Sequence, residues 1–81
     1  MKRILLVDDQ KEVKDLLSRF FFLNGYEVES VDDGEAAMGL IKKKHYDLVV
    51  AGFLMPKMDG LDLTKKLKRY DPSLSILIIS G

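Results

Sequence analysis

The fold of this chain is indicated most directly by the stretch DLVVAGFLMPKMDG, which runs from Asp47 to Gly60. Its first part is a short apolar run that stops at Gly52, and the pair Asp59-Gly60 after the following loop is typical of a helix start. An apolar strand, a tight loop and a helix form the unit of open α/β sheets, which place their chemistry at the carboxyl ends of the strands. Gly52 stands at such an end and brings no side chain to it.

Apolar runs of the same kind lie elsewhere in the chain. Ile4–Val7 has the composition of a strand buried in a parallel sheet, and residues 26–31 alternate as in a half-exposed edge strand. Leu74–Ile79 is predicted as a fourth strand. Hydrophobic spacing predicts three helices between the strands, over residues 10–24, 35–44 and 60–70. The resulting alternation of strand and helix favours parallel βαβ units with right-handed crossovers.

Local signals mark the ends of the predicted helices. Asp9 is a candidate N-cap of the first helix, and Asn24-Gly25 is a C-cap signal at its other end. Asp32-Asp33-Gly34 predicts a turn and a cap before the second helix. We expect Lys42–Lys44 in the last turn of that helix, where cations suit the helix dipole, and Pro72 to end the third helix.

The predicted first helix has one apolar face, formed by Val13, Leu16, Leu17, Phe20 and Phe21. Three successive phenylalanines cannot all lie on one side of a helix. We therefore expect Phe22 to point outward, where an exposed aromatic side chain can mark a contact surface.

Length and composition exclude several classes of protein. Eighty-one residues allow one domain, and 13 basic residues balance 13 acidic ones, so there is no global field that would hold nucleic acid. Without cysteine, and with His45 as the lone histidine, a zinc cluster is excluded. No apolar run is long enough for a membrane span or a signal peptide, so a cytoplasmic protein is expected.

Two clusters of cations remain open to two interpretations. They comprise Lys42–Lys44 and, in the third helix, Lys65, Lys66, Lys68 and Arg69. Each cluster is explained by a solvated helix end. Together they could also offer an acidic partner a docking face.

The apolar runs 4–7 and 48–51, the second within a predicted strand over 47–51, predict central, adjacent strands, whose ends would bring Asp8-Asp9 beside Gly52. Two adjacent carboxylates at a strand end can hold a hard divalent cation that keeps several waters. The same pair can also serve only to cap the following helix. The spacing alone leaves both interpretations open.

Three segments, ILLVDD, DLVVAGFLMPKMDG and ILIISG, resemble the receiver domain of two-component response regulators. They occur in the right order and on the right elements, and the resemblance covers residues 1–81. It implies a flavodoxin-like α/β fold, here a partial one, with a parallel sheet of four strands in the order 2-1-3-4 and three helices.

The resemblance also implies roles for individual residues. Asp8 and Asp9 match the acidic pair that holds Mg²⁺, and the backbone carbonyl of Leu54 matches a third ligand. Ser80 matches the hydroxyl residue that signals the active state. Three further residues match loop-shaping and helix-capping positions and are not phosphoacceptors: Pro56, Asp59 and Gly60.

The chain departs from the family pattern in two ways. Gly52 occupies the position of the phosphoaccepting aspartate, and phosphoryl transfer needs an oxygen nucleophile. The sequence also stops after the fourth strand, whereas the family continues with a helix, a strand that bears a lysine, and a final helix. We therefore expect a receiver-like domain that lacks the last helix-strand-helix portion, has no catalytic residue, and binds Mg²⁺ weakly if at all.

These features favour a receiver module that is not an enzyme and that acts through protein contacts. The partners implied are a sensor histidine kinase or an output domain in the parent protein, with neither nucleic acid nor a membrane bound by this domain. The apolar residues 76–79 predict an open sheet edge and hence a dimer or larger homo-oligomer. Two alternatives stay open: an engineered or truncated fragment of a phosphorylatable response regulator, and a purely structural, oligomerising βα fragment.

Overall fold

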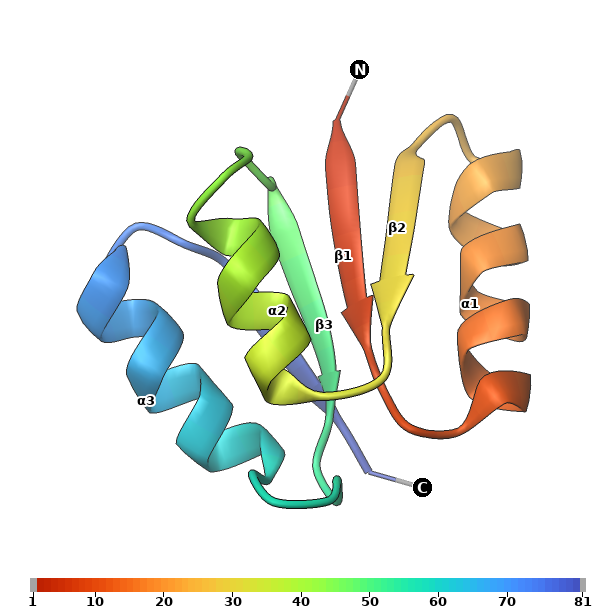
Figure 1. The fold of residues 1–81 in the computed structure, drawn as a ribbon. Coiled ribbons are helices and arrows are strands. Elements are labelled where there is room, and N and C mark those ends of the chain that lie inside the picture. Colours follow the sequence, from red (N-terminus) through yellow and green to blue (C-terminus); the bar gives the residue numbers. More distant parts are fainter. Residues whose placement is uncertain (1, 81) are drawn as a thin grey trace.

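The computed structural model describes residues 2–80, in which strands and helices alternate along the chain (Figure 1). The elements are β1 (Arg3–Val7), α1 (Lys11–Leu23), β2 (Glu27–Val31), α2 (Gly34–Ile41), β3 (Leu48–Gly52), α3 (Gly60–Tyr70) and β4 (Ile76–Ile79). The four strands form one parallel sheet in the order β2-β1-β3-β4. The predicted fold class, strand order and alternation are confirmed.

The two fully apolar strands lie at the centre of the sheet, as the sequence predicts. β1 pairs with β3 in a register that sets Leu5 opposite Val49 and Val7 opposite Ala51, and all four side chains are buried. β2 lies at one edge and is half-exposed, which agrees with its alternating sequence. The carboxyl ends of β1 and β3 therefore open side by side.

Helices cover both faces of the sheet. α2 and α3 lie side by side on one face, and α1 lies on the other, over β2 (Figure 1). The core beneath α2 and α3 consists of Leu5, Val7, Ala37, Ile41, Tyr46, Val49, Ala51, Leu63, Leu67 and Leu74. The smaller core beneath α1 consists of Ile4, Leu6 and Val50, with Leu17 and Phe21 packed against it.

The helix caps follow the sequence signals at three of four sites. The side chains of Asp33 and Asp59 accept hydrogen bonds from the backbone N–H groups of Ala36 and Asp62, both at 2.9 Å. Gly25 follows the end of α1 with φ of +89°, a conformation that favours glycine.

The prediction that Asp9 caps α1 is wrong. Gln10 occupies the N-cap position, and its side chain accepts no capping hydrogen bond. The acidic residue that bonds to the backbone in this turn is Asp8, whose Oδ1 accepts a hydrogen bond from the Gln10 N–H at 2.8 Å. This bond turns the chain from β1 towards α1 and leaves Asp9 exposed.

The second helix is shorter than predicted, because α2 ends at Ile41 and Lys42–Lys44 lie beyond it. The N–H groups of Lys43 and Lys44 both bond to the carbonyl of Leu40, at 3.0 and 2.9 Å, in a turn that closes the helix. The chain must turn here because Tyr46 is buried against the sheet. Leu74 is also buried, but it precedes β4 and is not part of that strand.

The face of α1 that contacts the sheet is narrower than the apolar pattern predicts. Leu16 and Phe20, expected in the core, are 70% and 57% exposed, because α1 reaches the sheet through Leu17 and Phe21. Phe22 points outward as predicted and is 71% exposed. None of the described helices has the combination of length and apolarity that a membrane crossing requires.

Candidate functional site

A small pocket of about 100 Å³ opens where β1, β3 and β4 end. Its lining consists of Asp8, Gln10, Gly52, Phe53, Leu54, Ile79 and Ser80. Four residues singled out in the sequence therefore come together here from three segments far apart in the chain. The parallel register brings them together, since it places Gly52 opposite Ile79 and the end of β1 beside the end of β3.

Asp8 is the charged group of this pocket. Only 9% of the residue is exposed, and its Oδ1 is held by the N–H of Gln10. A Cβ atom on residue 52 would lie 2.6 Å from Asp8 Oδ2, closer than real Cβ contacts occur. The carboxylate of Asp8 thus occupies the space that a side chain at position 52 would enter.

The other predicted metal ligands are arranged less compactly. Asp9 is exposed and is not part of the pocket lining. Leu54 lines the pocket, although its side chain is 76% exposed. Within residues 2–80, no three carboxylate or imidazole side chains gather in a way that could hold a metal ion. A hard cation here would depend on one buried carboxylate, on backbone and hydroxyl oxygens, and on water.

The loop between β3 and α3 frames the pocket from one side. The N–H of Gly60 donates to the carbonyl of Phe53 at 2.8 Å, and a Cβ on Gly60 would lie 2.6 Å from the carbonyl oxygen of Gly52. Asp59 caps α3, while Pro56 is exposed on the loop. Only glycine at position 60 allows the start of α3 to approach the end of β3 this closely.

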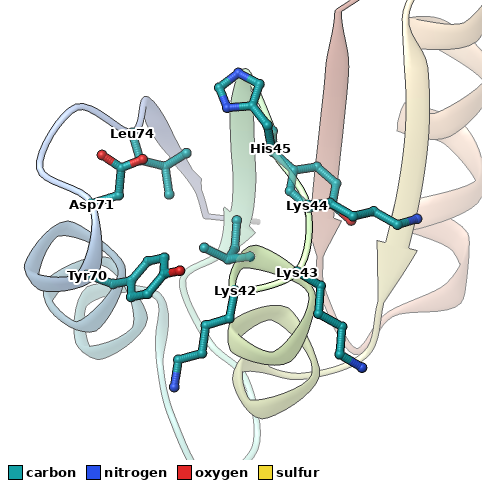
Figure 2. A pocket seen from close by; sticks show the side chains of 9 residues that line it. Lys42, Lys43, Lys44, His45, Tyr70, Asp71 and Leu74 are labelled. Atoms are coloured by element: carbon teal, nitrogen blue, oxygen red, sulfur yellow. The ribbon is translucent and has the colours of Figure 1, made fainter.

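A larger pocket of about 280 Å³ lies near the opposite end of the sheet, between the ends of α2 and α3. Figure 2 shows the side chains of Lys42, Lys43 and Lys44 spreading away from the end of α2, while Tyr70 reaches over from α3. These cations do not converge on one point of the pocket. Its geometry therefore offers no focused site for a reaction.

Beside that pocket, a hydrogen bond of Tyr46 joins the segment before β3 to β2. The Tyr46 hydroxyl donates to Oε1 of Glu29, and Oε2 of Glu29 lies 2.9 Å from the Nζ of Lys44. Burial, followed by the bond to Glu29, raises the pKa of Tyr46 well above its usual value. The same hydroxyl bond lowers the pKa of Glu29. The group is a structural tie between β2 and the segment before β3.

Several residues of the pocket, and the Tyr46–Glu29 hydrogen bond, were not predicted from the sequence. Gln10, Phe53 and Ile79 line the pocket. The signal for Phe53 and Ile79 is their place directly after or at the end of a strand, whereas Gln10 lies in the turn after β1, at the N-cap of α1. The Tyr46–Glu29 bond spans 17 positions, so no local pattern indicates it.

Comparisons with known proteins agree with this architecture. Residues 4–81 match the model of the response regulator receiver domain. The response regulator MprA of Mycolicibacterium vanbaalenii is 40% identical over 79 residues, which is 98% of this chain and 34% of that protein. The chain thus spans about a third of the length of the curated relatives it matches.

Two solved structures are similar over nearly the whole chain. The response regulator protein TrrA of Thermotoga maritima, in complex with Mg²⁺-BeF, is 31% identical with a TM-score of 0.95, covering 99% of this chain and 70% of that one. TrrA in complex with the histidine kinase ThkA is 31% identical with a TM-score of 0.94, covering 100% of this chain and 70% of that one.

Proposed function

The chain belongs to the response regulator receiver family. We propose that it is a signalling module of a two-component phosphorelay that works without its own phosphorylation at position 52. The absence of phosphorylation at position 52 is inferred from one observation. Gly52 stands at the carboxyl end of β3, on the pocket, and has no oxygen nucleophile. The module acts through protein contacts and not as an enzyme.

The position of Asp8 supports this proposal. Its carboxylate already occupies the space next to Gly52, at 2.6 Å from where a Cβ would stand. Phosphoryl transfer depends mainly on positioned groups and charge, and still requires an acceptor oxygen in line with the donor. The strand β3, the following loop and the start of α3 still surround the pocket, but residue 52 supplies no acceptor oxygen.

We further propose that the pocket binds Mg²⁺ weakly, through Asp8, Asp9 and the backbone carbonyl of Leu54. Asp8 and Leu54 line the pocket, whereas Asp9 must turn inward to reach it. An aspartate at position 52 would add a third carboxylate. Its absence relieves repulsion between like charges and removes a ligand, so the cation is held less tightly.

The remaining roles follow the same proposal. Ser80 lines the pocket and serves as the switch hydroxyl, and Pro56, Asp59 and Gly60 shape the loop. The partners are a sensor histidine kinase or an output domain of the parent protein, in the cytoplasm, with neither nucleic acid nor membrane bound by this domain. Residues 1–81 then belong to a receiver domain.

A titration with Mg²⁺ followed by beryllofluoride tests the proposal, with amide NMR shifts of the pocket residues as the readout. The chain is compared with Gly52→Asp, which restores the carboxylate. Gly39→Asp serves as the control, because Gly39 is exposed on α2 and a Cβ there meets nothing within 4 Å.

In Gly52→Asp the end of the Asp8 side chain must shift to admit the new Cβ. We expect this variant to bind Mg²⁺ about tenfold more tightly than the chain or the control, because it adds a charged ligand. Beryllofluoride takes the place of a phosphoryl group on the acceptor carboxylate, which only Gly52→Asp supplies, so it should shift pocket amides only in that variant. A saturable beryllofluoride shift in the unaltered chain would reject the proposal, and equal Mg²⁺ affinity in all three proteins would reject the role of Gly52 in weakening the metal site.

A further inference from the structure

Charge is unevenly distributed over this neutral chain, with a group of cations on one side of α3. Lys57 precedes the helix, and Lys65, Lys66 and Arg69 lie on its solvent side, all four exposed. Among residues 2–80, none of these four forms an ion pair, whereas Lys11, Lys14 and Lys44 each pair with a carboxylate. The cations on α3 are therefore free to meet external anions.

These cations border two adjoining hollows of about 240 and 360 Å³. Lys57, Met58 and Lys66 line both hollows, so the two form one groove along the β3–α3 loop and α3. The larger hollow reaches the start of α2, which lies beside α3 (Figure 1). The smaller one is completed by Lys65, Arg69 and Asp62.

Met58 gives the groove an apolar floor. It is partly buried and packs against the core beneath α2 and α3. Its sulfur lies 2.8 Å from where a Cβ on Gly34 would stand, so the absence of a side chain at Gly34 lets Met58 settle against α2. Methionine is adaptable and suits contact with varied apolar side chains.

We propose that this groove binds an acidic peptide segment of a partner protein. Its carboxylates pair with Lys65, Lys66 and Arg69, and an apolar side chain rests on Met58. Asp62, Asp33 and Glu35 line the same hollows and repel any anion that lies against them. A peptide also carries backbone N–H groups that can donate to these carboxylates, whereas a phosphodiester backbone has only acceptors, so the mixed charges favour a peptide.

The test is fluorescence anisotropy with a labelled peptide that alternates glutamate and leucine, titrated with the 81-residue chain. The variants are Lys66→Glu and Arg69→Glu. Lys68→Glu is the matched control, because it makes the same charge change on the same helix at an exposed residue outside both hollows. A peptide with glutamine in place of glutamate and a single-stranded DNA oligonucleotide complete the comparison.

Reversal of a contacting charge should weaken peptide binding by about fivefold or more in each variant, whereas Lys68→Glu should change it by less than about twofold. In the unaltered chain, amide NMR shifts on adding the peptide should concentrate in residues 57–69, which tests the site without any substitution. The proposal is overturned by equal losses in all three variants, by equal binding of the glutamine peptide or the oligonucleotide, or by no binding.

Discussion

Gly60 is held between two backbone contacts at the start of α3. Its N–H bonds to the Phe53 carbonyl, and the Gly52 carbonyl oxygen lies 2.6 Å from the place of a Cβ. A methyl group at this position would force the β3–α3 loop away from the strand end. Because the contacting atom is backbone, it cannot move aside as the tip of a side chain can.

We predict that Gly60→Ala lowers the free energy of unfolding by about 1 to 3 kcal/mol, measured by urea denaturation. Gly39→Ala is the matched control, because its Cβ meets nothing within 4 Å and alanine favours a helix. That variant should be up to about 1 kcal/mol more stable than the unaltered chain. Equal stability of the two variants would show that the close approach at Gly60 does not constrain the fold.

Tyr46 offers a second test at the scale of single residues. The change Tyr46→Phe removes the hydroxyl that donates to Glu29 and keeps the buried ring. We expect a loss of about 1 to 2 kcal/mol of stability at about pH 7, because a hydrogen bond to a charged group is lost. Tyr26→Phe alters a half-buried tyrosine and should change stability by less than about 0.5 kcal/mol.

The pH dependence of the Tyr46→Phe effect follows from the lowered pKa of Glu29. A carboxyl group whose pKa is lower in the folded state stabilises the fold above its unfolded pKa, and this contribution is lost as pH falls through the folded pKa. The stability difference between the chain and Tyr46→Phe should therefore shrink as the pH is lowered through and below the usual pKa of a glutamate. A difference that stays constant or grows over this range would contradict the assigned bond.

At the scale of elements, the start of α3 depends on its cap. Asp59→Ala removes the carboxylate that accepts the Asp62 N–H, and we expect a loss of about 1 kcal/mol in the free energy of unfolding. Asp59→Asn keeps a side-chain oxygen acceptor and should lie within a few tenths of a kcal/mol of the unaltered chain, as thermal or urea denaturation can show. If both substitutions cost the same, the cap bond would not be the cause.

The elements were predictable where the signal is local or where the strand order fixes the outcome. Asp33 and Asp59 indicate the starts of α2 and α3. The apolar sequences of β1 and β3 predict that these strands pair at the centre of the sheet, which brings Asp8 beside Gly52. The face of α1 was not predictable from periodicity, because Leu16 has the same spacing as Leu17, and only the neighbouring strands determine which is covered.

In the candidate site, too, some features were predictable from the sequence and others were not. The meeting of Asp8, Gly52 and Ser80 follows from parallel strands that end at one edge of the sheet. Asp9 could not be placed from the sequence, because Asp8 and Asp9 compete for the same turn, and the bond from the Gln10 N–H favours Asp8. The tie between Tyr46 and Glu29 joins distant segments and needs the folded structure to be seen.

Across the whole molecule, the two outer strands of the sheet differ in the charge they carry. β2 carries Glu27 and Glu29, whereas β4 is the apolar sequence Ile76–Ile79, with Leu77 51% exposed. Among residues 2–80, β4 pairs only with β3. An apolar edge strand is a template for pairing with another chain, whereas charges on an edge discourage it. We therefore propose that the 81-residue chain self-associates through β4.

Sedimentation velocity at micromolar concentration tests this proposal, and we predict a concentration-dependent dimer or larger species. Leu77→Lys places a charge on β4 and should shift the population to monomer. Leu16→Lys makes the same change at an exposed leucine on α1 and should leave the association intact. Dissociation by Leu16→Lys instead, or a monomeric unaltered chain, would contradict pairing through β4.

The most direct measurement of the central claim is the intact mass of the chain after treatment with a small phosphodonor and Mg²⁺. The absence of an acceptor at Gly52 predicts that the unaltered chain keeps its mass. Gly52→Asp, measured under the same conditions, is the comparison in which a phosphoryl group is expected. A stable acyl phosphate on the unaltered chain, removed by hydroxylamine, would contradict the claim that the module works without its own phosphorylation.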